Sequence, residues 1–353
     1  MPIFDQGYQH WSGQLASPAW RWLAIARQGV RVGLANRWIR SLLLFAWLPV
    51  IPLATMLCTW GLIERNSDLI TTIGPLLGFL DPAILAGPRP YRVEIWTLSY
   101  SYFLAAQLRF AMIVILLVGP NLISQDLRYN ALPLYFSRPL RRFDYFLGKL
   151  GVIVAFLALV IIVPSLAAYV LGLLFSLDIT IVRDTFRILL ASLAYGLVIA
   201  ISAGLLILAL SSLSRNSRYI ALLWLGIWFV TSSVSTVLGI IDQEQQRHAA
   251  RGEGINPRNA PFLNSQLEAS KTDWRPLISY TTNLSRIGQE LLGTDAAWQK
   301  MSKLQPAQTR SRFLLRFGGW QFPWYWSAFV LLGLLGISAC ILNLSVKSLD
   351  RLK

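Results

Sequence analysis

The sequence predicts an all-α, polytopic membrane protein with six transmembrane helices, because it is rich in apolar residues and contains six long stretches almost free of charge. Of its 353 residues, 55% are hydrophobic and only 14% are charged, whereas a soluble domain carries roughly 25% charged residues. A formal net charge of +15 is typical of nucleic-acid-binding proteins, but a soluble one needs a more polar surface. We therefore expect the lipid bilayer, and no nucleic acid, as a partner.

Six stretches are long enough to cross the bilayer, for which a helix needs about 20 mostly apolar residues. An N-terminal segment, 1–40, precedes this six-span domain, 41–346, and a short tail, 347–353, follows it. The domain includes a long outer segment, 242–317, before the last span. The predicted spans are 41–63, 97–123, 150–177, 188–214, 219–241 and 318–346.

The basic residues between the spans predict the orientation, because segments on the cytoplasmic side carry an excess of Lys and Arg. With the N-terminus in the cytoplasm, the segments on that side carry 15 basic and four acidic residues, and those on the other side carry 16 and 13. This difference predicts that both termini are cytoplasmic. The cytoplasmic segments are then 1–40, 124–149, 215–218 and 347–353.

The N-terminal segment combines Trp20, Trp22 and Trp38 with five arginines. Tryptophan and arginine together suit the headgroup level of a membrane. At about 100° per residue, however, the arginines do not gather on one narrow helical face. Two interpretations stay open, a helix lying at the interface or a short solvated lead-in to the first span.

The segment 124–149, between the second and third spans, carries the most specific pattern. Asp126 suits a helix start, Pro133 disrupts the helix that follows, and Pro139 can open a new helix leading into the third span. A short helix on a basic cytoplasmic surface is a suitable docking element for a peripheral subunit. A basic loop that only fixes the topology is the alternative, and the pattern alone does not decide between them.

An acidic residue, a short helix, Arg-Pro, aromatic residues and Gly-Lys leading into a span resemble the cytoplasmic loop of type 2 ABC exporter permeases. In that family the loop is the coupling helix, which docks on the ATP-hydrolysing subunit. Arg138, Pro139, Gly148 and Lys149 match the usual lead into the third span. The family commonly has Glu at Asp126 and a Gly-Thr pair at Asn130 and Ala131. The docking role implied by the resemblance falls on Asp126, Leu127, Arg128, Tyr129, Leu134, Tyr135, Arg138 and Pro139.

The resemblance implies a non-catalytic permease subunit of an ABC exporter in the bacterial cytoplasmic (inner) membrane. It implies a cytoplasmic ATPase partner and a homodimer or a heterodimer with a related permease. The chain lacks a G-x-x-x-x-G-K-[ST] phosphate loop, so we expect ATP on the partner and no cofactor or metal in this chain. Apolar span walls suit an amphipathic cargo. The alternatives are a membrane partner of an ATPase that does mechanical or regulatory work without cargo and, less favoured, an integral membrane enzyme.

The outer segment 242–317 divides into a charged part, 242–271, and a patterned part. Apolar residues at helical spacing predict an amphipathic helix over 282–292 that Gly293 terminates. A second short helix follows Thr294 and Asp295. The resemblance implies outer re-entrant or interfacial helices that roof a pathway, and an ordinary packed loop is the alternative.

Arg109 is the only charged residue in the six predicted spans. A charge at the centre of a span costs about 2.5–3.5 kcal/mol on insertion scales, so such a residue faces a cavity or finds a partner. One interpretation places Arg109 on the pathway, where it meets an anionic group of the cargo. In the others, the span starts later than Thr97 and Arg109 lies near the outer interface, or Arg109 pairs with an acid such as Glu94.

Overall fold

The computed structural model describes residues 20–65, 87–136, 141–176, 179–252, 274–304 and 322–350, and every regular element in these ranges is a helix. This confirms the all-α prediction. Within these ranges, six helical stretches are long and apolar enough to cross a membrane, as predicted. They are Arg37–Glu64, Arg89–Arg128, Phe143–Ser176, Thr180–Leu213, Ser217–Ile241 and Trp324–Ser345.

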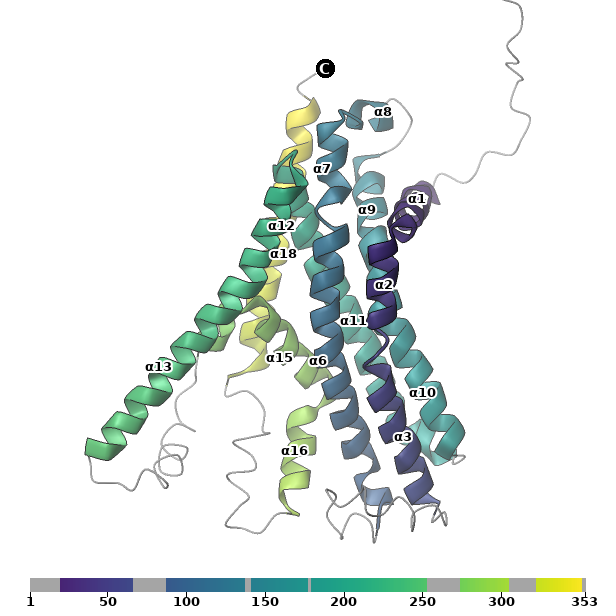
Figure 1. Cartoon of the computed structure of the whole chain (residues 1–353), viewed down its shortest axis with the longest axis vertical. Helices are drawn as coiled ribbons and strands as arrows, with labels where there is room; N and C mark the ends of the chain where they lie inside the picture. The colour runs from purple at the N-terminus through teal and green to yellow at the C-terminus, as the bar shows by residue number, and fades with distance from the viewer. Residues whose placement is uncertain are drawn as a thin grey trace, which may run out of the picture.

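The spans run roughly along the long axis of the molecule, and the N-terminal helix α1 (Arg21–Ala35) runs across them (Figure 1). Several spans consist of more than one helical piece. In chain order the pieces are α2 (Arg37–Phe45) and α3 (Val50–Glu64); the 3₁₀ turn η3 (Arg89–Tyr91), α6 (Arg92–Val118) and α7 (Asn121–Arg128); α9 (Arg142–Leu157), the π-helical turn η4 (Ala158–Ile162) and α10 (Val163–Ser176); α11 (Ile179–Leu213); α12 (Ser217–Leu225), the π-helical turn η5 (Gly226–Val230) and α13 (Thr231–Gly252); and α18 (Trp324–Asp350).

The bundle has two distinct ends. At the α8 end, the short helix α8 (Leu132–Phe136) lies at the same end of the bundle as α1 and the end of α18 (Figure 1). The Ser212 and Ser345 hydroxyls, 3.1 Å apart, join the ends of α11 and α18 there. At the opposite, α16 end, the helix α16 (Thr294–Ser302) packs against α6. The first described helix and the end of the last one therefore lie at the same end, as six crossings require.

Prolines explain three of the breaks in the spans, because proline has no N–H and its ring clashes with the carbonyl four residues earlier. Span one breaks at 46–49, and Gln107 of α6 donates from Nε2 to the freed Ala46 carbonyl at 2.9 Å. Span two breaks at Gly119 and Pro120. In span three, the wider turn η4 comes just before Pro164, where a regular helical hydrogen bond cannot form.

The core lies around α6 and α11, and span five is the most peripheral. Of the most apolar stretch of each span, 61% is buried in span four and only 11% in span five. Trp224 attaches α12, the first part of span five, to span two by donating from Nε1 to the Met112 carbonyl at 3.1 Å. Beyond it, α13 projects away from the other spans (Figure 1). Most of span five is thus left for lipid or another protein chain.

Helices extend beyond the predicted limits at one end or both ends of every span. The second starts at Arg92 and not at Thr97, the fourth starts at Ile179, and α13 continues to Gly252. At the ends of spans two and four, Arg92 and Asp184 pair with each other across neighbouring helices. The charged residues there are therefore stabilised within the helices and do not end them. The last helix begins at Trp324, just after Pro323, and the predicted start of this span at 318 lies outside the described residues.

The two helices predicted in the outer segment are confirmed. The first, α15, runs over Tyr280–Leu292, begins at the Ser279 side chain, which accepts from the Thr282 N–H, and ends at Gly293 with φ 73°. Glycine is favoured there because left-handed backbone carries no penalty without a Cβ. The second helix is α16. Since α15 packs against α6, α11 and α18, these two helices are part of the bundle's packing.

Candidate functional site: the helix pair between spans two and three

Helix α7 is fixed to span four at the break that precedes it. The Ser211 hydroxyl of α11 donates to the Pro120 carbonyl at 3.0 Å and accepts from the N–H groups of Ile123 and Ser124, each at 3.1 Å. A break in a transmembrane helix frees backbone groups that need partners inside the protein. One buried side chain from α11 meets that need here, so the start of α7 cannot move independently of span four.

The turn between α7 and α8 depends on Asn130, which has φ 51°. Asparagine tolerates left-handed backbone better than most residues. The Ala131 N–H then donates to the Asp126 carbonyl at 2.9 Å, which closes the end of α7. Asn130 therefore supplies the backbone conformation for which glycine is the usual residue, and this accounts for the departure from Gly-Thr at this point of the sequence.

Asp126 faces into the protein, where its carboxylate joins α7 to α9. Its Oδ2 atom lies 2.6 Å from Lys149 Nζ and accepts from the Tyr145 hydroxyl at 2.6 Å, both on α9. The Lys149 ammonium also lies over the rings of Tyr145 and of Tyr135 on α8, at 5.4 and 5.9 Å from their centroids. We call Asp126, Tyr135, Tyr145 and Lys149 the Asp126 cluster. Burial, and then the charge of Asp126, raises the pKa of the Tyr135 phenol.

The exposed part of the helix pair is its tip, which consists of Arg128, Tyr129, Asn130 and Pro133. Tyr129 is 72% exposed, and the Arg128 guanidinium lies 5.7 Å from the centroid of its ring. A cation and an aromatic ring held together in this way present both charge and apolar area to a partner.

The residues predicted for docking therefore fall into different environments. Arg128 and Tyr129 are exposed at the tip, whereas Asp126 contacts α9, and Leu127 and Tyr135 are half-buried. The side chain of Leu134 and all of Arg138 and Pro139 lie outside the described residues. Sequence reasoning missed Ser211, for which no local signal exists. It also missed Tyr145, although its i, i+4 spacing from Lys149 places both on one helix face.

Arg109 is exposed about midway along span two, on the same face of α6 as Tyr102 and Ala105. Two of the interpretations of this residue were wrong. The span starts earlier than Thr97, and Glu94 pairs with Lys300 of α16 at 2.7 Å. In the part of the chain that the structure describes, no acidic residue pairs with Arg109.

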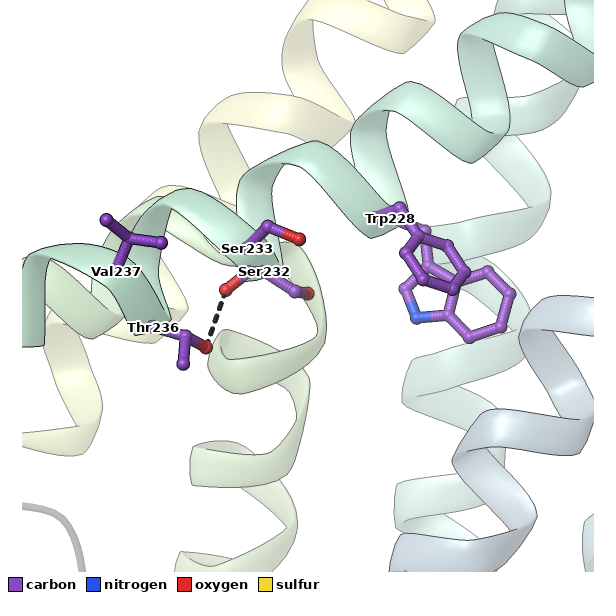
Figure 2. A pocket seen from close by; sticks show the side chains of 6 residues that line it. Trp228, Ser232, Ser233, Thr236 and Val237 are labelled. Atoms are coloured by element: carbon purple, nitrogen blue, oxygen red, sulfur yellow. Dashed lines mark hydrogen bonds between the residues drawn. The ribbon is translucent and has the colours of Figure 1, made fainter. Parts of the chain in front are cut away.

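Cavities flank the exposed parts of spans one, two and five. A shallow pocket of about 350 Å³ lies on span five, lined by Trp228, hydroxyl side chains and Val237 (Figure 2). A more apolar cavity of about 400 Å³ separates α3 from α6 and is lined by residues such as Pro52 and Leu98. No cluster of three or more His, Cys, Asp or Glu side chains that could hold a metal occurs within the described ranges.

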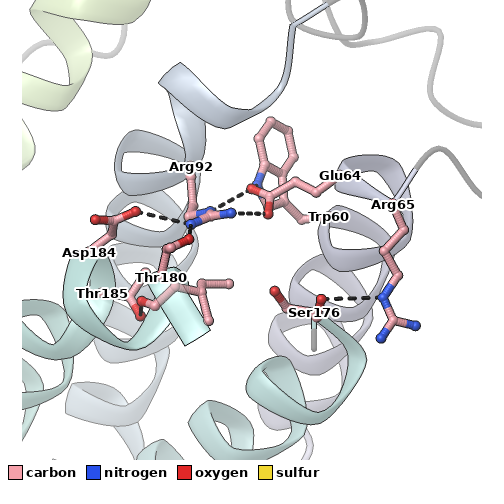
Figure 3. A network of polar contacts seen from close by, with 9 residues as sticks. Trp60, Glu64, Arg65, Arg92, Ser176, Thr180, Asp184 and Thr185 are labelled. Carbon is pink, nitrogen blue, oxygen red and sulfur yellow. Dashed lines mark hydrogen bonds and ion pairs between the residues drawn. The ribbon is translucent and has the colours of Figure 1, made fainter. Parts of the chain in front are cut away.

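At the α16 end, the buried Arg92 joins three spans (Figure 3). Its guanidinium binds both carboxylate oxygens of Glu64 on α3, at 2.6 and 2.8 Å, and Asp184 Oδ2 on α11 at 3.0 Å. Trp60 Nε1 donates to Glu64 at 2.8 Å and Thr180 accepts from Arg92 at 3.0 Å. A buried ion pair is tolerated when its remaining hydrogen-bonding groups are satisfied in this way. The sequence did not predict this network, because its members are far apart in the chain.

The structure is that of a multi-pass membrane protein. It has six spans, a basic end with an exposed helix pair, and polar groups that mostly bond to one another. The family model described as ABC-2 family transporter protein matches residues 38–346, and the chain belongs to this family. It is a non-catalytic membrane subunit of an ABC transporter, and membership implies an ABC ATPase as its partner. No curated protein matches the chain.

Proposed function

We propose that the chain is the permease subunit of an ABC exporter and that its separate ATPase docks on the tip of the α7–α8 pair. The observation that carries the proposal is the attachment of this pair: Ser211 holds the start of α7 to span four and Asp126 holds its end to span three. Arg128 and Tyr129 remain exposed at the tip. An element that is fixed on one side and exposed on the other can transmit the movement of a partner.

The attachment also suggests how ATP hydrolysis would be coupled to the spans. A force on the tip could bend span two at Gly119 and Pro120, and the movement would then be lost. Because Ser211 and the Asp126 cluster join α7 to α11 and α9, the force is passed to spans three and four as well. Packed helices respond by sliding or rotating as units, which would change access to the pathway.

The orientation belongs to the same proposal. The tip lies at the α8 end together with α1 and the end of α18, and the segments at this end carry most of the excess basic charge of the chain. The positive-inside rule then places the α8 end in the cytoplasm, where an ATPase has access to ATP. The membrane is the bacterial cytoplasmic membrane.

The pathway would lie between two permease copies, either identical or related. An unpaired arginine midway along a span is unfavourable against lipid, and Arg109 is exposed on the outside of a single chain. A second copy across the face of Tyr102, Ala105 and Arg109 would enclose a pathway there and remove this cost. Apolar walls with one guanidinium suit an amphipathic cargo that carries an anionic group.

The docking claim is tested by co-purification of the chain with a candidate ABC ATPase, which is first sought among the products of the neighbouring genes. Arg128→Glu and Tyr129→Ala are expected to reduce the amount of bound ATPase at least tenfold. Arg218→Glu, also exposed but located between spans four and five, is the matched control and should keep it. Full retention by the Arg128→Glu/Tyr129→Ala double variant would show that the tip is not the docking surface. ATP-driven cargo movement in vesicles would then separate an exporter from a partner that moves no cargo.

A further inference from the structure

The position of α1 is set by close packing against α9. Gly148 of α9 lies against Trp22 and Ile25, and a Cβ added there would lie 2.7 Å from the Cβ of Ile25 and 2.9 Å from the Trp22 carbonyl. Gly29 and Gly33 of α1 receive Val152 and Phe156 in the same way. One face of α1 therefore packs against α9, and the opposite face is directed away from the bundle.

The outer face of α1 combines arginine with apolar side chains. Arg27 and Arg31 are one turn apart and exposed, and Leu23 and Val32 beside them are 45% and 61% exposed. Because α1 runs across the spans (Figure 1), this face lies along the plane of the membrane and not through it. This arrangement supports the interfacial helix over the solvated lead-in.

Span one continues this surface in the direction of the membrane interior. Its first turn exposes Arg37 and Arg40, and Trp38 between them is 69% exposed. Leu44 follows on the same face, one turn beyond Arg40, and is 75% exposed. The exposed surface thus changes within a few residues from guanidinium groups to uncharged, mainly apolar side chains such as Leu44, Phe45 and Leu48. A lipid leaflet changes in the same direction, from headgroup to acyl chain.

The charge on this surface is of one sign. The sequence has no Asp or Glu between residues 20 and 63, and among the described residues no acidic side chain pairs with Arg27, Arg31, Arg37 or Arg40. A guanidinium group presents donors in a fork that matches two phosphate oxygens. The surface therefore offers hydrogen-bond donors and positive charge to a phosphate group, and no carboxylate to a cation.

We propose that the outer face of α1 and the first turn of α2 bind anionic phospholipid headgroups of the leaflet at the α8 end. Arg27, Arg31, Arg37 and Arg40 contact the phosphates, Trp38 lies at the headgroup level, and Leu44 contacts the acyl chains. Leu44 continues this surface from the guanidinium groups towards the acyl chains. The bound lipid holds α1 between α9 and the leaflet.

The test uses the full chain reconstituted in nanodiscs of phosphatidylcholine, with and without phosphatidylglycerol, and needs no ATPase. Phosphatidylglycerol is expected to raise the Tm of the wild type and to remain bound in native mass spectra. Each arginine near an anionic surface contributes roughly fivefold to binding. Arg27→Gln/Arg31→Gln and Arg37→Gln/Arg40→Gln should therefore each weaken phosphatidylglycerol binding by more than tenfold and remove much of the Tm increase.

The controls separate this site from general charge effects and from loss of folding. The pair Arg215→Gln/Arg218→Gln removes two exposed arginines from the same end of the molecule and should leave the lipid effect unchanged. Arg→Lys versions of the test pairs keep the charge and should keep most of the binding. The proposal is overturned if the test pairs retain the full effect, or if the control pair loses it equally. If the test pairs retain the full lipid effect but lose the ATPase in the separate co-purification assay, this face belongs to the ATPase.

Discussion

At the scale of single residues, Asp126 shows how a residue in a docking segment can serve the segment's attachment. Its side chain is 14% exposed and that of Lys149 is 11% exposed, so the two charges interact largely out of water. Breaking such a pair by removing one partner leaves an uncompensated charge. We therefore expect Asp126 to affect stability first and docking only through the position of the tip.

Asp126→Asn is expected to lower the free energy of unfolding by on the order of 3 kcal/mol, because Lys149 keeps its charge in a buried site. Asp126→Asn/Lys149→Met, which removes both charges, should recover part of this loss. Thermal unfolding of the wild type, Asp126→Asn, Lys149→Met and the double variant measures the coupling between the two side chains. Arg128→Ala, at the exposed tip, is the control and should leave stability unchanged. Additive effects of the two substitutions on stability would contradict an ion pair between Asp126 and Lys149.

Ser211→Ala is expected to free the N–H groups of Ile123 and Ser124. Leaving buried polar groups unsatisfied costs about 1–3 kcal/mol, and the local cost appears as faster amide hydrogen exchange at these two positions. Ser212→Ala is the matched control, because this neighbouring hydroxyl bonds to the Ala209 carbonyl and to Ser345 instead. Equal exchange at residues 123 and 124 in both variants would refute the role given to Ser211.

Arg109→Cys, in a chain without Cys58 and Cys340, tests whether this position lines an aqueous pathway. A charged, membrane-impermeant thiol reagent is expected to modify it in membranes, because thiolate forms only where water has access. Leu197→Cys, exposed about midway along span four, is the comparison position and should react at least tenfold more slowly. Failure of Arg109→Cys to react with and without ATP would place Arg109 against lipid or protein.

At the scale of elements, the glycines of α1 and α9 decide how closely two helices approach. The contact at Gly148 involves the backbone carbonyl of Trp22, which cannot swing aside as a flexible side chain can. The two helices must therefore separate if a larger residue is introduced. Since α1 carries the proposed lipid surface, its distance from α9 also sets where that surface lies.

Gly148→Ala is expected to lower stability by about 1–3 kcal/mol, the usual cost of overpacking. Gly226→Ala is the matched control, because a Cβ there meets no atom within 4 Å and alanine favours a helix over glycine. Thermal unfolding in the same detergent measures both. A Gly148→Ala protein as stable as the wild type would mean that α1 is not held in close contact with α9.

At the scale of the whole molecule, the spans differ in how far one chain buries them. Span four is the most buried of the six, whereas span five is attached mainly near Trp224 and Ser232 and then leaves the bundle. The pocket of Figure 2 lies on this exposed part. Arg109, which pairs with no acidic residue among those described, lies on a second such surface. Together these surfaces argue that the functional unit has more than one membrane chain.

Much of the fold could be predicted from local sequence. Uncharged stretches predict spans because backbone groups in lipid must bond within the helix, and Gly293 marks a helix end because of its backbone freedom. Helix ends that carry charged residues were harder to predict from the sequence. Nothing local to Arg92 indicates that Glu64 and Asp184 accept hydrogen bonds from its guanidinium. The candidate site was predicted as a segment, but the inward direction of Asp126 was not.

Hydropathy and residue spacing alone predict that this chain is helical, that it has six spans and that the excess of basic over acidic residues lies in the segments on one side of them. These properties depend on hydropathy and on residue spacing, which are local. The packing of the helices decides that Asp126 faces Lys149, that Ser211 closes the break in span two and that no acidic side chain in the described ranges pairs with Arg109. Those outcomes depend on which helices are neighbours and on how they are rotated, and the period of a single helix contains no information about either.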